Sequence, residues 1–359
     1  MNEKGSYGTN RLSEEDKTQL KNRIIRSARI IRQNEKQKKY WAIAASIALL
    51  LGAFWMYQLT TQKEGNELMN YAQRMSTVDM RNVQQVTIRL EDGKDVSVDG
   101  DSVSIAYSSS GEQIAVGTKE AVRQKCNKGA DVGFNELVVP FGKRSQVSLS
   151  DGTRVWVNAG SRLIYPIAFN GDLREVYLEG EAVFDVSHHA EKPFIVQTQN
   201  QHIRVLGTVF NVQSYPSEQH QFVVLKSGSI SLSHKKKIGG KPKKEMLVAP
   251  GTKVNLDRES FKVTSSAVDV ADYFSWMEGV LILHNNDLSY IMNQLSRYYN
   301  VDIFIADEEL SHETFSGRLD LKDDILNVVD IIKHGSDIDY QLSKNNQIII
   351  RKLKQQPMK

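Results

Sequence analysis

The dipeptide Gly207-Thr208, in the run VLGTVFNV, places a hydroxyl nucleophile directly after a residue with unusual backbone freedom. In a strained peptide the Thr208 oxygen can attack the Gly207 carbonyl carbon, which converts the amide to an ester and prepares the chain for cleavage. The alternative is a glycine bulge within a strand, because the flanking residues are typical of β-structure. The pattern by itself favours the bulge.

Other residue types that support catalysis occur without a motif. The eight histidines are scattered, the pair His188-His189 has no further ligand at useful spacing, and Cys126 is the only cysteine. No phosphate-binding glycine loop or nucleophile elbow is present. Asp151 belongs to an Asp-Gly turn, where its side chain bonds the backbone. We therefore expect no conventional enzyme, no metal and no cofactor, although four carboxylates are candidates for acid–base pairing: Asp151, Glu179, Glu181 and Asp185.

One apolar run, Trp41–Leu59, separates two chemically different parts of the chain. It contains no charged residue, Leu50 lies at its centre, and aromatic residues lie near both ends. As a helix of roughly 19 residues it spans the ~30 Å hydrocarbon core of a bilayer. A buried helix would carry a polar stripe, and a signal peptide would not follow so long a hydrophilic segment. The run therefore predicts a transmembrane helix.

The charge distribution predicts the orientation of this helix. Residues 1–40 contain 11 Lys and Arg against 5 Asp and Glu, whereas the remainder contains 35 against 38. An excess of basic residues close to one end of a span holds that end in the cytoplasm. We expect a cytoplasmic N-terminus with the bulk of the chain outside. Because topology explains the basic charge, we expect no direct contact with nucleic acid.

Residues 1–40 are typical of a short amphipathic helix. Ser13 is a predicted N-cap, followed by acids that oppose the helix dipole. An apolar stripe comes after it, and a lone helix of this kind gains stability from a partner. It can equally lie along a lipid surface, and the pattern leaves both interpretations open. The stripe includes Leu20, Ile24, Ile25 and Ile31.

Residues 60–81 are polar and helix-compatible, which predicts a spacer next to the membrane. Residues 82–275 alternate in short apolar and polar steps, which predicts an all-β domain. Within them, LEDGKDVSVDGDSVSI from Leu90 matches LSDGTRVWVNAGSRLI from Leu149. A glycine turn followed by alternating apolar residues occurs five times, at Gly93, Gly152, Gly180, Gly228 and Gly251. Such stacked hairpins indicate a sandwich or a solenoid-like body.

Residues 276–359 predict a small α+β domain with the order β-α-β-β-α-β-β. The expected strands are Val280–Leu283, Val301–Ile305, Phe315–Leu319, Ile338–Leu342 and Gln347–Ile350. One helix is capped by Asn285, Asn286 or Asp287 and ends at Asn300, and a second is opened by Asp323 or Asp324 and stopped by Gly335. The whole chain is thus predicted to be a single-pass membrane protein with two folded domains beyond the span.

Several ordered motifs between Asn135 and Leu256 resemble the FecR family of transmembrane anti-sigma regulators, in its Bacteroidota form. They are GKRSQVSLSDGTRVWVNAGSRLIYP, REVYLEGEAVFDV, KPFIVQT and VLGTVFNVQSYP. The region from Trp276 resembles the domain that follows in that branch, which is similar to the short signalling domain of secretins and TonB-dependent transducers. The cytoplasmic segment departs from the family pattern, because many relatives carry a longer region of several helices.

The resemblance implies a role in the inner membrane. The cytoplasmic segment is expected to bind an extracytoplasmic-function sigma factor, and the periplasmic part to read the state of an outer-membrane TonB-dependent transporter. Envelope proteases would then release the cytoplasmic piece. Some members cleave themselves at a similar Gly-Thr bond. The resemblance therefore strengthens the prediction of self-cleavage between Gly207 and Thr208.

A second hypothesis, from another class, is a membrane-anchored module that binds glycans or other envelope components. This hypothesis predicts exposed aromatic side chains on one face of the β domain. The candidates are Trp156, Tyr165 and Tyr177. Their alternation with apolar neighbours suits a core equally well.

Overall fold

The computed structural model describes residues 18, 21, 52, 55, 67–75, 79–117, 121–125, 133–234, 245–343 and 347–353. The chain divides into two units, Met1–Asn66 and Glu67–Lys359. In the first unit, Thr18, Lys21, Gly52 and Trp55 are helical. Within the described ranges, no helix combines the length and the apolar character needed to cross a membrane. Several residues of the predicted partner-binding stripe and span lie outside those ranges: Leu20, Ile24, Ile25, Ile31, Trp41, Leu50 and Leu59.

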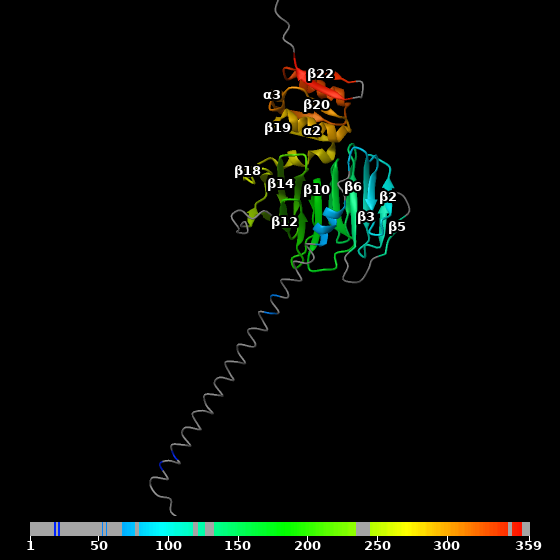
Figure 1. Ribbon diagram of the computed structural model, residues 1–359, viewed down its shortest axis with the longest axis vertical. Coiled ribbons are helices and arrows are strands. Elements are labelled where there is room, and N and C mark those ends of the chain that lie inside the picture. Colours follow the sequence, from blue (N-terminus) through cyan, green and yellow to red (C-terminus); the bar gives the residue numbers. More distant parts are fainter. Residues whose placement is uncertain are drawn as a thin grey trace, which may run out of the picture. The chain divides into compact units, whose positions relative to one another are not determined.

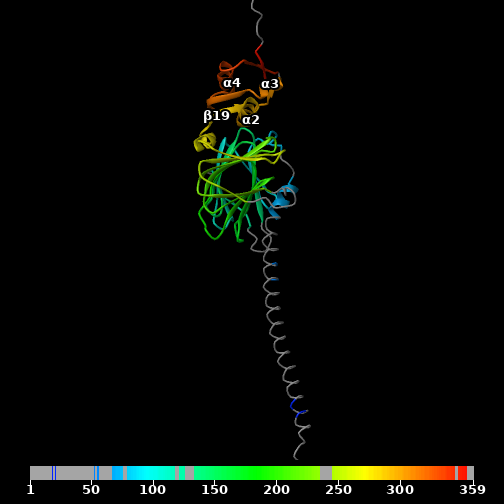
Figure 2. The same cartoon turned by 90° about the vertical axis from the view of Figure 1, so that its left-hand side faces the viewer.

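The second unit contains a β-body in which strands form two facing layers (Figures 1 and 2). The strand order in the first layer is β2-β1-β6-β9-β10-β11-β12-β15-β16. In the second layer it is β5-β4-β3-β7-β8-β10-β13-β14-β17-β18. Successive hairpins alternate between the layers, which agrees with the predicted stacking of hairpins. The strands are β1 (Val86–Arg89), β2 (Asp95–Val98), β3 (Ser102–Tyr107), β4 (Gln113–Val116), β5 (Val122–Arg123), β6 (Phe134–Val139), β7 (Arg144–Ser148), β8 (Arg154–Val157), β9 (Ser161–Pro166), β10 (Arg174–Asp185), β11 (Phe194–Gln197), β12 (Gln201–Val205), β13 (Val209–Ser214), β14 (His220–Ser227), β15 (Ile230–His234), β16 (Met246–Val248), β17 (Thr252–Asp257) and β18 (Val263–Ala267).

The sequence repeat at Leu90 and Leu149 forms the same turn twice. Leu90 N donates to Lys94 O and Gly93 N to Leu90 O, and the equivalent bonds join Leu149, Thr153 and Gly152. Both glycines have a left-handed φ, 79° and 81°, as a three-residue hairpin loop requires. The predicted hairpins β1–β2 and β7–β8 are therefore confirmed.

The prediction of a glycine turn at Gly180 is wrong. This residue lies within the long strand β10, whose first half pairs with β9 and β11 and whose second half pairs with β8 and β13. Gly180 adopts φ 111°, and a Cβ there would lie 2.6 Å from the Cα of Ser161. The glycine thus allows one strand to bend from the first layer into the second and to join the two sheets at this corner.

The core of the body consists of the apolar side chains that face each other between the layers. Phe184 and Phe210 stack with ring centroids 5.2 Å apart, and valines and isoleucines of both sheets surround them. Tyr165 belongs to this core and its hydroxyl lies 2.9 Å from that of Tyr107. Tyr177 is also buried. The glycan hypothesis therefore lacks the exposed aromatic side chains expected at these two tyrosines.

The C-terminal domain has the predicted order of elements. Its strands are β19 (Val280–Asp287), β20 (Ile303–Ile305), β21 (Thr314–Asp320), β22 (Ile338–Leu342) and β23 (Ile348–Lys352), arranged as a pair β19-β21 and a sheet β20-β23-β22. Helix α2 (Leu288–Tyr299) follows Asp287 and ends at Asn300, which has a left-handed φ of 52°. The Asp324 side chain caps helix α4 (Ile325–His334) by accepting from Leu326 N. The short helices η1 (Val270–Tyr273), η2 (Ser275–Glu278) and α3 (Glu308–Ser311) were not predicted.

Candidate functional site

The peptide between Gly207 and Thr208 lies in the connection from β12 to β13, beside a bulge in the pairing of Val209 and Phe210. A Cβ on Gly207 would lie 2.6 Å from His188 Nδ1, and one on Gly228 would lie 2.8 Å from the Gly207 carbonyl oxygen. Close packing on both sides therefore requires glycine at both positions. The alternative prediction placed a glycine bulge within a strand, whereas Gly207 lies before β13 and the register shift falls between Val209 and Phe210.

The hydroxyl of Thr208 is held inside this packed peptide. Thr208 is only 4% exposed, and its Oγ1 donates to the carbonyl of Ser229 at 3.1 Å. That hydrogen bond directs the hydroxyl proton to Ser229 and leaves lone pairs of the oxygen for other contacts. The arrangement holds the hydroxyl in place, and a nucleophilic role for it stays a prediction.

The four candidate carboxylates do not form one acid–base pair. Asp151 accepts from Thr153 N at 2.9 Å, as the turn predicts, and from the buried Arg174 at 2.8 Å. Asp185 pairs with Arg154 on the surface of the second layer. In the described ranges, no group of three or more His, Cys, Asp or Glu side chains is placed to hold a metal.

A buried ion cluster holds the first helix of this unit against the body. Residues 67–74 of the predicted spacer are helical, and Leu68 packs with Phe134 and Ile164. The Arg162 guanidinium pairs with Glu136 and also donates to the Ala72 carbonyl at 3.1 Å. This carbonyl is near the C-terminal end of the helix, where basic groups stabilise unpaired carbonyls.

Contacts from η2 and α2 fix the C-terminal domain on the body. Arg297 of α2 is buried, lies 2.8 Å from Glu218, and stacks on the Tyr215 ring at 4.0 Å. Arg144 of β7 donates to the Trp276 carbonyl at 2.9 Å and lies over the Tyr298 ring. The side chains of Arg297 and Glu218 are both largely shielded from water, so loss of either partner would leave a buried charge uncompensated.

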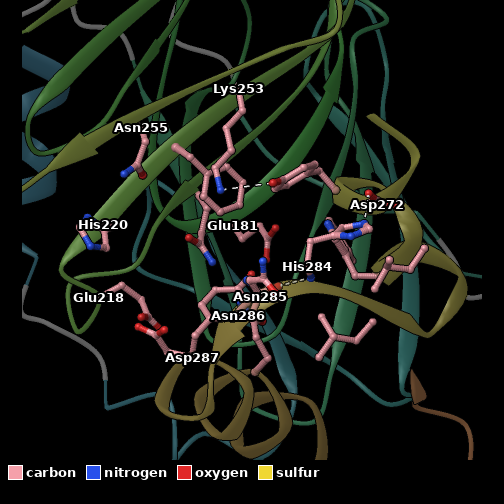
Figure 3. Close-up of a pocket in the computed structure, with 18 of the residues that line it drawn as sticks. Glu181, Glu218, His220, Lys253, Asn255, Asp272, His284, Asn285, Asn286 and Asp287 are labelled. Carbon is pink, nitrogen blue, oxygen red and sulfur yellow. Dashed lines mark hydrogen bonds and ion pairs between the residues drawn. The ribbon is translucent and has the colours of Figure 1, made fainter. Parts of the chain in front are cut away.

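A cavity of about 380 Å³ opens at this junction (Figure 3). On one side the cavity is lined by residues of β10, β13, β14 and β17 of the body. On the other side it is lined by residues of η1, η2, β19 and the start of α2. Aromatic, amide, carboxylate and imidazole groups line it. The residues used below are Glu181, Gln213, Glu218, Lys253, Asp272, Tyr273, Trp276, His284 and Tyr290.

Two charged side chains of the cavity have perturbed acidity. Burial raises the pKa of Glu181 above its ordinary value, although hydrogen bonds from Asn211 and Asn158 oppose this effect. Burial lowers the pKa of Lys253, whose amine donates to the Tyr273 hydroxyl at 3.3 Å. Both shifts have the same physical cause, because removal from water disfavours the charged form of each group.

Two family models match the chain. The model described as FecR protein matches residues 135–231, and the model described as FecR, C-terminal, matches residues 280–350. The chain therefore contains both regions that the FecR models describe.

Two solved structures are similar to this chain over about three fifths of its length. A candidate anti-sigma factor from Parabacteroides distasonis ATCC 8503, solved at 2.50 Å, is 28% identical with a TM-score of 0.56, over 61% of this chain and 99% of that one. A second structure from the same organism, described in the same way and solved at 1.65 Å, is 28% identical with a TM-score of 0.56, over 60% and 98%. No curated protein matches this FecR chain significantly.

The matched regions locate the site residues within the family architecture. Gly207, Thr208 and Arg162 all belong to the region matched by the FecR model. Lys253 and Trp276 lie between the two matched regions and still line the cavity. The sequence analysis missed the cavity and the ion cluster, because their members are far apart in the chain and share no local motif.

Proposed function

We propose that this FecR protein is a single-pass regulator of the inner membrane that carries a signal from an outer-membrane TonB-dependent transporter to an extracytoplasmic-function sigma factor. The main support is the presence of both FecR regions in one chain, together with similarity over almost the whole length of a candidate anti-sigma factor. Trp41–Leu59 would span the membrane, with residues 1–40 in the cytoplasm and the described domains in the periplasm.

The cytoplasmic segment would bind the sigma factor through its apolar stripe. In the predicted helix Leu20 and Ile24 would lie one turn apart, so acidic residues at both positions would place charge on the proposed binding surface. We expect the full chain with Leu20→Glu and Ile24→Glu to lose co-purification with its sigma factor and to release transcription from a sigma-dependent promoter. Lys21→Ala, at an exposed helical position, is the matched control. Unchanged binding by the double variant would contradict this function.

The C-terminal domain would receive the transporter's signalling domain on the sheet β20-β23-β22. Phe304 of β20 is 56% exposed, and its neighbour across the parallel pairing is Ile349. β20 and β22 form the two edges of this sheet and are suited to strand addition. Phe304→Asp should abolish induction by the transporter substrate while the sigma factor still co-purifies. Leu247→Asp, at an exposed leucine of β16, should leave induction unchanged.

Signal would cross the bilayer by proteolysis, because one unpaired span offers little mechanical leverage. Envelope proteases would cut the chain, and self-cleavage between Gly207 and Thr208 would provide a first break. Thr208 Oγ1 would attack the Gly207 carbonyl carbon, and its proton would pass to the Thr208 nitrogen as the C–N bond breaks, which gives an ester and a free Thr208 amine. Water would then hydrolyse the ester to a Gly207 carboxylate and restore the Thr208 hydroxyl. Full-length protein should yield two fragments, and Thr208→Ala should remain intact. Thr208→Ser, which retains the hydroxyl, should still split, and identical fragments from Thr208→Ala would exclude this nucleophile.

A further inference from the structure

The cavity between the body and the C-terminal domain has features of a ligand site that the proposed sigma-factor function does not require. Its volume of about 380 Å³ falls in the range of small-molecule sites. Both domains contribute walls, so one bound molecule would contact both. We propose that this cavity binds a small neutral polyhydroxylated ligand, such as a mono- or disaccharide, and that the bound ligand stabilises the docked C-terminal domain.

Two lining residues carry buried hydrogen-bond donors that have no acceptor among the residues that the structure describes. They are Gln213 Nε2 and Trp276 Nε1, and both residues are more than nine-tenths buried. A buried donor without a partner loses its hydrogen bonds to water and forms none within the protein, which costs free energy. Both nitrogens are themselves covered, so hydroxyl oxygens of a ligand would reach them once the two side chains rotate toward the cavity.

The charges of the lining disfavour an anionic ligand. Glu181, Glu218, Asp272 and Asp287 contribute four carboxyl groups, whereas Lys253 is the lysine of the lining. The Lys253 amine already donates to Tyr273, and it lies 4.7 Å from the centre of the Phe222 ring. A carboxylate or phosphate entering the cavity would therefore meet mainly negative charge and acceptor oxygens.

A strongly cationic ligand is also disfavoured, because protein partners already occupy most of these carboxyl groups. Glu181 accepts from Asn158 at 2.9 Å and from Asn211 at 3.0 Å. Glu218 lies 2.8 Å from Arg297, and Asp272 lies 2.7 Å from His284 Nε2. The remaining lone pairs of such paired carboxylates accept from neutral hydroxyl groups at little electrostatic cost.

Aromatic side chains provide the apolar part of the lining. Phe222, Tyr273, Trp276 and Tyr290 surround the polar groups. A sugar has apolar C–H faces and polar edges, which match aromatic walls and amide or carboxyl groups respectively. The mixture of donors, acceptors and aromatic rings thus favours a sugar over a purely apolar molecule.

The test uses the full chain purified in a detergent without a sugar headgroup. Calorimetry at millimolar concentrations would compare neutral mono- and disaccharides with citrate, inorganic phosphate and spermidine. We expect at least one neutral saccharide to bind, and the anions and spermidine not to bind. Trp276→Phe and Gln213→Met each remove one donor while retaining most of the volume, and each should weaken binding about fivefold. Leu247→Ala, at an exposed residue of β16 outside the cavity lining, should bind as the parent does.

Hydrogen exchange gives a second measurement that is independent of the variants. Saccharide should slow amide exchange in η1 and η2 of the parent protein, because the ligand would hold these helices against the body. Asn255→Ala, on β17 at the cavity wall, provides a further binding variant if either donor variant fails to fold. Binding of no neutral saccharide would overturn the proposal, as would preferential binding of a charged probe or equal affinity in all folded cavity variants. None of these outcomes depends on whether the chain binds a sigma factor.

Discussion

Replacement of Arg162 by methionine would test the attachment of helix 67–74 to the body. The guanidinium of Arg162 is 2% exposed and pairs with Glu136, whose side chain is fully buried. It also donates to the Ala72 carbonyl and lies 3.7 Å from Glu179. Methionine retains much of the apolar volume and removes all three polar interactions, so the variant isolates the contribution of the charge.

The expected loss of stability follows from the partners that remain. Removing one member of a buried ion pair typically costs about 3–5 kcal/mol, because the other charge stays without compensation. Arg89 Nη1 lies 3.4 Å from Glu136 and offers a substitute, although its side chain is 29% exposed. Loss of the hydrogen bond from Arg162 to the Ala72 carbonyl costs about a further 1 kcal/mol. We therefore expect Arg162→Met to lower the free energy of unfolding by about 3 kcal/mol.

Urea unfolding of the full chain measures this change, and limited proteolysis measures the release of the helix. Arg89→Met removes the outer contact to Glu136 and the half-exposed pair with Asp95, so it should cost no more than about 1 kcal/mol. The double variant Arg162→Met with Glu136→Leu removes the uncompensated charge as well. It should recover most of the loss, while the helix stays more accessible to protease because the Ala72 carbonyl has lost its donor.

Two results would refute this reasoning. A cost below about 1 kcal/mol for Arg162→Met would show that the buried pair contributes no more than a surface pair. A double variant as unstable as the single variant would show that the loss comes from altered packing and not from an unpaired Glu136. Under the proposed function, a released helix should also increase cleavage near the membrane and raise sigma-dependent transcription.

Two further perturbations test other parts of the unit. Burial lowers the pKa of Lys253, so the folded state binds the ammonium proton less tightly than the unfolded state does. The free energy of unfolding should therefore rise as pH increases from the folded-state pKa toward the ordinary value of 10.5. Lys253→Met should flatten this alkaline rise in urea unfolding, and an unchanged pH profile would contradict the assignment. Gly180→Ala would place a Cβ 2.6 Å from Ser161 Cα at φ 111°, and should cost at least about 1–3 kcal/mol, measured as a lower thermal midpoint. Gly251→Ala has a left-handed φ but open space around it, so it should cost less.

The hairpins and helix ends of this protein are determined locally, which is why the sequence predicts them. In the repeat from Leu90 and Leu149, the turn depends on an Asp and a Gly within five residues, and both copies form the same hydrogen bonds. Asp324 and Asn300 bound their helices through contacts with the nearest turn. Such interactions are short in sequence and have characteristic residue types.

The candidate sites depend on contacts between distant residues, and only the tertiary structure brings these together. Arg162 reaches Glu136 across 26 positions and the Ala72 carbonyl across 90. Arg144 and Tyr298, at the domain junction, are 154 positions apart. Gly180 resembles the turn glycines in sequence, yet the neighbouring Ser161 makes it the bend of a continuous strand.

The sequence by itself therefore determined the family resemblance, the order of the main elements in the C-terminal domain and most local turns. The sequence also suggested the proposed self-cleavage, because that chemistry requires only the dipeptide Gly207-Thr208. The packing of that dipeptide between His188 and Gly228, the ion cluster under helix 67–74 and the junction cavity were decided by the tertiary structure. The physical reason is that burial, which sets the cost of an unpaired charge or donor, is a property of the assembled layers and not of any short segment.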